Sequence, residues 1–141
     1  NKYYAIISMS YLFLSCTKKK INDTYGHDVG DEVLRILSEI TRNEMRFTDV
    51  LARFGGEEFI ALLPNTTLDD AVILANRLCK KIEDHQVNIQ NKFFFNFTVS
   101  IGVSQLQSQE NDLTVLIKNA DIALYQAKKN GRNQVAVYTC E

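Results

Sequence analysis

The residues best suited to chemistry in this chain are two adjacent carboxylates, Glu57 and Glu58, which directly follow a pair of glycines. Apolar, β-prone residues lie on both sides of them, at 50–52 and 60–63. Two such runs around a Gly-Gly pair are typical of a hairpin, because glycine reaches positive φ at both central positions without steric cost. The glycines also let a ligand approach closely, and the carboxylates suit a hard divalent cation and a phosphate-bearing substrate. On turn chemistry alone, an ordinary solvent-exposed hairpin explains these residues equally well.

Three further segments give this hairpin its context. Residues 22–31 read NDTYGHDVGD, residues 99–103 read VSIGV, and residues 120–133 read ADIALYQAKKNGRN. In this order, the segments and the hairpin resemble the GGDEF family of diguanylate cyclases, whose signature is Gly-Gly-Glu-Glu-Phe at 55–59 of this chain. Several spaced motifs in a fixed order are far more specific than the hairpin alone.

The resemblance implies a reaction in which two GTP molecules are joined into cyclic di-GMP and pyrophosphate is released. Such a reaction requires neutralised phosphate charge, bound metal ions and a positioned 3′-hydroxyl. By the resemblance, Glu57 ligates Mg²⁺ or Mn²⁺ and is a candidate base for the hydroxyl, and Glu58 supports the metal site. Lys19 matches a lysine that contacts phosphate in the transition state.

The resemblance also implies a set of residues that bind GTP. Asn22 and Asp31 would hydrogen-bond guanine, whose edge offers both donors and acceptors, and His27 between them would help to shape the pocket. Lys128 and Arg132 match the family's triphosphate-binding pair. Their spacing of four places them on one side of a helix end.

A candidate regulatory site lies just before the hairpin. Arg46 and Asp49 fit the family's RxxD motif, in which an arginine and a carboxylate bind the product cyclic di-GMP. Four residues are a weak motif, and the position next to the hairpin is what gives it weight. Feedback inhibition by cyclic di-GMP is therefore a hypothesis for this chain.

The first strand departs from the family pattern, which places Asp-x-Asp-x-Phe-Lys at its end. Counting back from Asn22, those places hold Leu14, Cys16 and Lys18, and no Asp or Glu occurs between residues 1 and 17. Leucine cannot ligate Mg²⁺, and a thiol is a poor ligand for a hard ion. Two interpretations stay open: loss of catalysis, or a local sequence irregularity with a few extra residues in this stretch.

These observations leave three functions. The leading one is a diguanylate cyclase, which we expect to work as a homodimer because two GTP molecules must face each other. The alternative is a degenerate, catalytically silent GGDEF domain that binds GTP or cyclic di-GMP as a receptor or scaffold. The third is a structural dimerisation module that binds neither nucleotide.

Periodicity predicts the elements that would position these residues. Helices are expected over 31–43, from Thr67 to about Asp84, and from Leu113 to the Asn-Gly at 130–131. Strands are expected over 3–14 as one piece or two, on both sides of the hairpin, over 93–103 as one long strand or a bent pair, and at 135–138. This pattern predicts an α+β fold with a mixed central β-sheet flanked by helices. The resemblance implies a nucleotidyl cyclase-like fold with a ferredoxin-like core.

Composition limits the remaining possibilities. A chain of 141 residues with 45% hydrophobic and 23% charged residues is expected to form one domain over 1–141, excised from a longer signalling protein. A net charge of −1 gives no general basis for binding nucleic acid or an anionic membrane. Three cysteines without metal-type spacing predict free thiols, and no apolar run is long enough to span a bilayer. We therefore expect a cytoplasmic location, whether as a free protein or as the cytoplasmic part of a membrane-anchored one.

Overall fold

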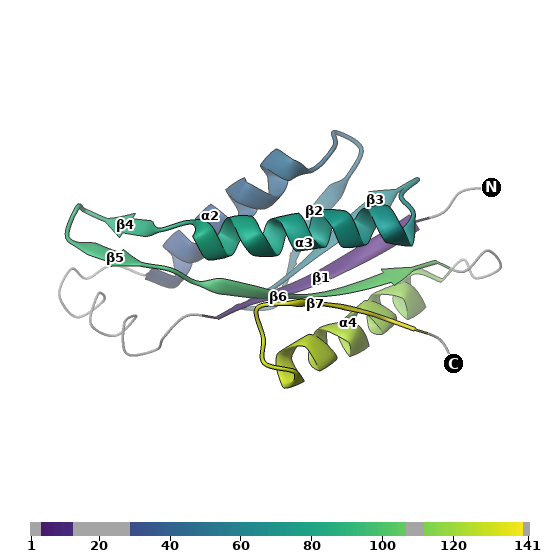
Figure 1. Cartoon of the computed structure of the whole chain (residues 1–141). Helices are drawn as coiled ribbons and strands as arrows, with labels where there is room; N and C mark the ends of the chain where they lie inside the picture. Colours follow the sequence, from purple (N-terminus) through teal and green to yellow (C-terminus); the bar gives the residue numbers. More distant parts are fainter. Residues whose placement is uncertain (1–3, 13–28, 107–111, 140–141) are drawn as a thin grey trace.

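The structure is a computed structural model that describes residues 4–12, 29–106 and 112–139 (Figure 1). The helices in these ranges are α2 (Val29–Glu44), α3 (Leu68–Asp84) and α4 (Leu113–Lys129). The strands are β1 (Tyr4–Leu12), β2 (Val50–Phe54), β3 (Glu58–Pro64), β4 (Val87–Ile89), β5 (Phe93–Phe95), β6 (Thr98–Gln105) and β7 (Val135–Val137).

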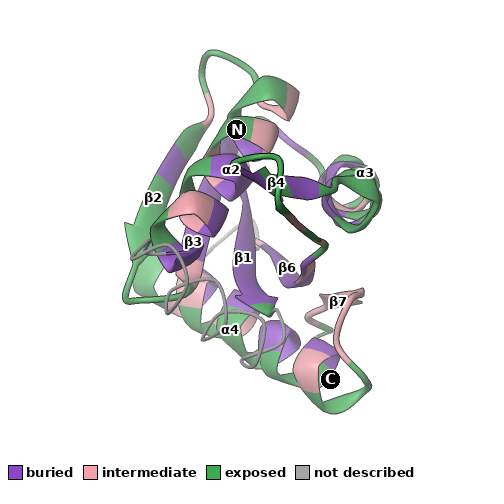
Figure 2. Cartoon of the chain, turned by 90° about the vertical axis from the view of Figure 1, so that its left-hand side faces the viewer, coloured by how far each residue is buried: buried purple, intermediate pink, exposed green. Residues whose placement is uncertain are grey.

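A five-stranded sheet in the order β2-β3-β1-β6-β7 forms the centre of the molecule. Its neighbouring strands are antiparallel except for β6 and β7, which are parallel. Helices pack on both faces, with α2 and α3 on one and α4 on the other (Figure 2). The predicted α+β fold with a mixed sheet is therefore confirmed.

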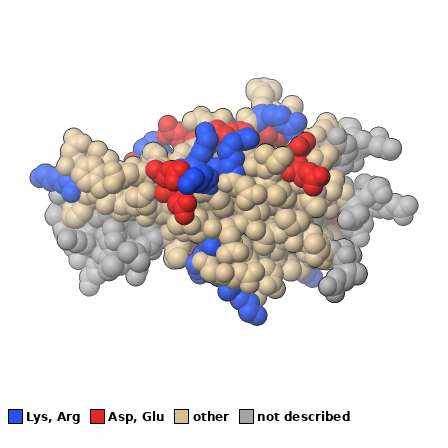
Figure 3. Space-filling view, in the orientation of Figure 1, with Lys and Arg blue, Asp and Glu red and all other residues tan. Residues whose placement is uncertain are grey.

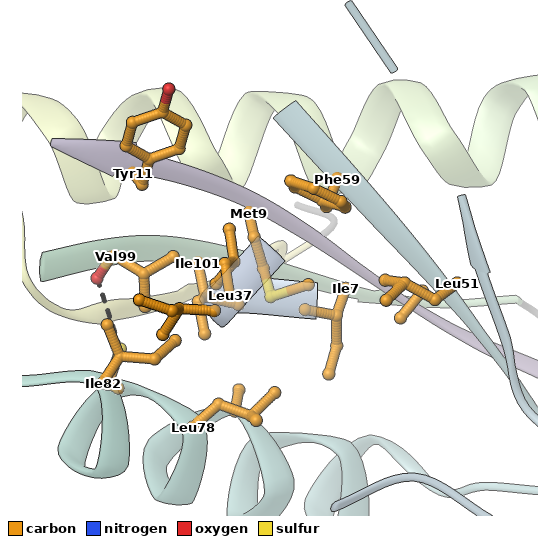
Figure 4. Packing of buried hydrophobic residues seen from close by; sticks show 14 of the residues in the cluster. Ile7, Met9, Tyr11, Leu37, Leu51, Phe59, Leu78, Ile82, Val99 and Ile101 are labelled. Atoms are coloured by element: carbon orange, nitrogen blue, oxygen red, sulfur yellow. Dashed lines mark hydrogen bonds between the residues drawn. The ribbon is translucent and has the colours of Figure 1, made fainter. Parts of the chain in front are cut away.

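The larger hydrophobic core lies between the sheet and the pair α2 and α3. Every second residue of β1 points into it, beginning with Ala5, Ile7 and Met9, as expected for the period of two in a strand. Leu37 of α2 and Leu78 of α3 meet these side chains (Figure 4). Residues at helical spacing on α2 and α3 thus close one face of the sheet.

The opposite face, under α4, holds a smaller core and buried polar residues. Ile6, Ile60, Leu116 and Ala120 form the apolar cluster. Four serines, all buried, follow the same face of β1 and β6: Ser8, Ser10, Ser100 and Ser104. The sequence places small polar residues where α4 comes close to the sheet.

The helix ends follow their predicted signals. The Thr67 hydroxyl caps α3 by accepting a hydrogen bond from the backbone N–H of Asp70 at 3.1 Å. Helix α4 ends at Lys129 and is capped by Asn130, after which Gly131 has a φ of +120°. There the N–H of Gly131 bonds the Lys128 carbonyl at 3.4 Å and the N–H of Arg132 bonds the Ala127 carbonyl at 2.9 Å, which is a Schellman motif.

One local prediction needs correction. In the hairpin only Gly55 has a positive φ, at +77°, because the turn contains Glu57 as a third residue and Phe54 pairs directly with Glu58.

Of the two alternatives predicted for 93–103, the structure has the pair of strands, because β5 pairs with β4 in a small second sheet and β6 starts afterwards. Asn96 lies at the break, where its side-chain amide donates to the carbonyls of Glu83 and His85.

Candidate active site

The acidic hairpin joins the edge strand β2 to its neighbour β3. Glu57 is exposed in the turn, and Glu58 begins β3 with 45% of its side chain exposed. A Cβ built on Gly55 or Gly56 would have no neighbour within 4 Å, so the tip is open to a ligand. The Arg53 guanidinium holds the turn from below, donating from Nε to the Gly55 carbonyl at 3.2 Å and from Nη2 to the Gly56 carbonyl at 2.9 Å.

A basic group reaches the hairpin from the other end of the chain. Lys128, in the last turn of α4, places its Nζ 3.9 Å from Oε1 of Glu58. Arg132 follows in the loop between α4 and β7, with its backbone in the left-handed region at a φ of +62°. The two predicted triphosphate ligands therefore leave the same helix end, one from its last turn and one from the loop after it.

Asp31 lies on the opposite side of the hairpin, in the first turn of α2. It lines a groove of about 410 Å³ between α2 and strands β2 and β3, together with Leu34, Arg35, Ser38, Arg42, Leu51, Arg53 and Phe59. The Arg35 guanidinium is paired with Glu32 at 2.7 Å and with Glu39 at 2.9 Å. The hydrogen bonds that Arg35 donates to both glutamates, and their negative charge, raise the pKa of Arg35, with Glu32 the larger cause. Arg53 borders both the groove and the turn, so the groove adjoins the acidic hairpin.

The RxxD residues form a closed ion pair. The Arg46 Nη2 atom lies 3.3 Å from Asp49 Oδ1, and the Arg46 backbone N–H donates to Asp49 Oδ2 at 2.8 Å. The same Nη2 donates to the Pro64 carbonyl at 2.7 Å and contacts the Thr66 hydroxyl. The Asp49 side chain is only 3% exposed against 55% for Arg46. This carboxylate is thus turned inward, and a ligand would meet the arginine first.

A second charged cluster lies close by, between α2 and α3. Glu44 accepts from Arg77 Nε at 2.5 Å and from Lys81 Nζ at 3.1 Å. Hydrogen bonds from Lys81 and Arg77, in that order, lower the pKa of Glu44. Basic and acidic side chains alternate on this face of the molecule (Figure 3).

Several sequence-based candidates lie outside the described residues: Lys19, Asn22 and His27, together with Leu14, Cys16 and Lys18 of the unusual first strand. In β1, Ser10 pairs with Glu58 of the neighbouring strand β3. Sequence reasoning missed Arg53, although a cation two residues before a Gly-Gly turn is a local signal for it. It also missed Asp121, whose carboxylate accepts a hydrogen bond from the Ser8 hydroxyl at 2.8 Å.

The donor atoms at the hairpin suit a hard cation. Glu57 and Glu58 offer carboxylate oxygens, and Mg²⁺ is commonly held by one or two carboxylates together with substrate phosphates and water. In the ranges that the structure covers, no three His, Cys, Asp or Glu side chains gather to hold a metal ion by themselves. The residues therefore fit a cation that the nucleotide helps to bind.

In the ranges that the structure describes, no helix has the length and apolar character needed to cross a membrane.

A mixed sheet covered by helices on both faces, with an acidic hairpin at one end, defines an α+β domain of nucleotidyl cyclase-like fold. Residues 8–134 match the family described as diguanylate cyclase, GGDEF domain. The chain belongs to the GGDEF domain family, and the resemblance predicted from its motifs is confirmed.

Individual relatives agree with this assignment. The chain is 42% identical over 118 residues to the response regulator PleD of Caulobacter vibrioides, covering 83% of this chain and 26% of PleD. It is 42% identical over 119 residues to diguanylate cyclase A of Treponema denticola, covering 84% and 32%. The active GGEEF domain of a diguanylate cyclase from Vibrio cholerae superposes with a TM-score of 0.83 at 34% identity, covering 99% of this chain and 85% of that one. The chain thus spans between a quarter and a third of the two curated relatives.

Proposed function

We propose that this domain is a diguanylate cyclase, which condenses two GTP molecules into cyclic di-GMP and releases pyrophosphate. The observation that carries the proposal is the meeting of opposite charges at the hairpin, where Lys128 lies 3.9 Å from Glu58 beside an open glycine turn. Relatives named diguanylate cyclase support the same reaction, among them a GGEEF domain with the signature residues found here at 55–59.

Each of the described site residues has its own role in the proposed reaction. Asp31, in the groove beside α2, hydrogen-bonds the guanine. Glu57 accepts the proton of the attacking 3′-hydroxyl as its oxygen bonds to the α-phosphorus of the second GTP. The bond from that phosphorus to pyrophosphate breaks at the same time, and Lys128 and Arg132 neutralise the leaving charge. The same attack by the 3′-hydroxyl of the second GTP on the α-phosphorus of the first closes the ring and releases a second pyrophosphate. Mg²⁺ or Mn²⁺ held by Glu57 and Glu58 supplies further positive charge at the phosphates when bound.

The proposed reaction needs two copies of the domain. Each copy supplies one groove and one hairpin, and therefore one GTP, so two must face each other for the attack. We propose a homodimer as the active form and cyclic di-GMP as a feedback inhibitor at Arg46 and Asp49. The turnover rate per molecule should then rise with protein concentration, and a rate independent of concentration in a strictly monomeric protein would contradict the dimer.

One observation favours a second function, a silent receptor for GTP or cyclic di-GMP. On β1, the buried side chains of Ser8 and Ser10, which face α4, are hydroxyls, and Ser10 pairs directly with Glu58. A hydroxyl carries no charge to hold a second cation, so binding without turnover is a real alternative.

A single experiment separates these functions. The protein is given GTP with Mg²⁺ or Mn²⁺, and pyrophosphate release and cyclic di-GMP are followed by chromatography, with Glu57→Gln and the distant surface variant Asp69→Asn beside it. Formation of cyclic di-GMP that is lost only in Glu57→Gln supports the cyclase. Binding of GTP or cyclic di-GMP without turnover would establish the receptor, and binding of neither would leave a structural module.

A further inference from the structure

The segment Val99 to Val103 has no part in the proposed reaction, yet it contacts both α4 and the loop after it, which carry the two proposed phosphate ligands Lys128 and Arg132. We propose that Ser100 is a positioning residue, which holds the loop at 131–133 so that Arg132 faces the triphosphate. This inference rests on the proposed function, because it assigns a role within the same site.

The loop backbone is left-handed over three residues. Gly131, Arg132 and Asn133 have positive φ angles of +120°, +62° and +49° in succession. Glycine and asparagine adopt this region readily, whereas for a residue such as arginine it costs roughly 1 kcal/mol or more. The conformation of Arg132 is therefore the one that the surrounding structure must hold.

Two backbone anchors hold the ends of this loop. On the helix side, the N–H of Arg132 bonds the Ala127 carbonyl at 2.9 Å. On the strand side, the N–H of Ile101 bonds the Gln134 carbonyl at 2.9 Å. The N–H of Asn133 lies between these anchors and donates to the Ser100 hydroxyl at 3.2 Å.

Ser100 is well placed to act as this anchor. It is 2% exposed, lies on strand β6 between β1 and β7, and pairs with Ser10 of β1. Its hydroxyl is therefore fixed by the sheet rather than by the loop. The Asn133 side chain adds a contact to Glu83 of α3, so the residue after Arg132 is tied to two rigid elements.

The glycine two residues further along β6 supports the same interpretation. A Cβ on Gly102 would lie 2.2 Å from the Ala120 carbonyl oxygen and 2.3 Å from the Leu124 nitrogen, so α4 rests directly on this strand. Gly102 allows the helix that carries Lys128 to lie close to the sheet, and Ser100 fixes the backbone of the loop that carries Arg132. One short strand segment thus positions both cations.

The test uses the whole protein and two matched serines. Ser100→Ala removes the acceptor for the Asn133 N–H. Ser104→Ala is the control, because Ser104 is equally buried on the same strand and donates to the Leu116 carbonyl at 2.7 Å, away from the loop. GTP affinity, KM and kcat are measured for Ser100→Ala, for Ser104→Ala, for Arg132→Ala and for the double variant Ser100→Ala/Arg132→Ala. Ser100→Thr keeps the hydroxyl, and Ser100→Cys is used where Ser100→Ala does not fold.

We expect Ser100→Ala to weaken GTP binding roughly tenfold, mainly through KM, with recovery in Ser100→Thr and little change in Ser104→Ala. If Ser100 acts through Arg132, the double variant binds GTP no more weakly than Arg132→Ala alone. Equal effects of Ser100→Ala and Ser104→Ala, or additive losses in the double variant, would overturn the role of Ser100 while leaving the cyclase intact. Wild-type protein that binds no GTP would instead overturn the proposed function together with this inference.

Discussion

The two faces of the central sheet are built in different ways. Under α2 and α3 the strands present a continuous apolar surface, with Ile7, Met9 and Ile101 packed against both helices. Under α4 the apolar cluster is small, and buried serines and a glycine occupy the neighbouring positions. Hydrophobic burial is strong but non-directional, whereas hydrogen bonds and close backbone contact fix a position. We infer that the face under α2 and α3 supplies most of the stability, and that the face under α4 fixes the position of that helix.

The directional contacts of α4 occur along most of its length. The Ser104 hydroxyl bonds the Leu116 carbonyl at 2.7 Å, Gly102 lies against Ala120, and the Ser8 hydroxyl bonds Asp121 at 2.8 Å. The contact at Leu116 lies in the first turn of α4, far from Lys128, whereas those at Ala120 and Asp121 lie nearer the last turn. We infer that the contacts at Ala120 and Asp121, and not the one at Leu116, set where the last turn with its proposed phosphate ligand lies.

The largest expected effect is that of Gly102→Ala on the α4 face. The added methyl group would lie 2.2 Å from a backbone oxygen, so the helix must move away from the sheet. We expect a loss of roughly 3 to 5 kcal/mol in the free energy of unfolding, measured in urea. Gly56→Ala is the control, since its methyl group would meet no atom within 4 Å. A loss below 1 kcal/mol in Gly102→Ala would contradict the close approach.

Leu78→Ala tests the opposite face. Leu78 is fully buried in the larger core, and its truncation should cost about 2 to 4 kcal/mol of stability through lost burial and a cavity. Because the change lies on the far side of the sheet from Lys128, the GTP affinity of the folded protein should stay within about twofold of wild type. A large loss of affinity at temperatures where the variant is folded would mean that the two faces are not separate in function.

Cys79 gives the larger core a pH dependence. Burial, and to a lesser degree Glu83, raises the pKa of this thiol to about 11 from 9.0. The folded state therefore keeps the proton that the unfolded state loses, so stability is complete below pH 9 and falls between pH 9 and about 11. We expect a fall on the order of 2 kcal/mol over this window in urea unfolding. The same fall in Cys79→Ala would show that other groups cause it.

The smallest expected effect on stability is that of Asp121→Ala, which removes the acceptor for Ser8. The change should cost about 1 kcal/mol, because Asp121 itself is exposed. Its effect on GTP affinity should exceed that of Leu78→Ala, since α4 loses a contact two turns before Lys128. Asp121→Asn keeps an acceptor and is the conservative control. If Asp121→Ala leaves GTP affinity unchanged, directional contacts do not position the helix end.

Local sequence signals predicted the regular elements well. The apolar spacing of Val33, Ile36 and Leu37 predicted a helix over 31–43, and α2 spans Val29–Glu44. The Thr67 cap and the Asn-Gly after α4 predicted helix ends that the structure has. Strand β4 was missed because three residues are too few to show a period, and the turn at Gly55 differs because Glu57 joins the loop.

The contacts that shape the candidate site could not be predicted in the same way. Ser8 and Asp121 are 113 residues apart, and Ser100 and Asn133 are 33 apart. Such pairs leave no local sequence pattern. Each serine is an ordinary strand residue and each partner an ordinary helix or loop residue, so neither indicates the other in the sequence. The motif VSIGV could be recognised from the sequence, but its physical task became visible only when β6 and α4 were seen together.

The pairing of strand β7 with β6 bears on when the loop at 131–133, which carries Arg132, becomes ordered. It pairs in parallel with β6, and its bonds include the Ile101 N–H to the Gln134 carbonyl at 2.9 Å and the Tyr138 N–H to the Val103 carbonyl at 2.8 Å. A parallel pair cannot form through a short turn, so we expect β7 to pair with β6 only once α4 has docked on the sheet. We therefore expect the loop that carries Arg132 to be fixed together with α4 and β7. A nucleotide that binds it would slow amide hydrogen exchange along β7, and release of the nucleotide would let this edge of the sheet open first.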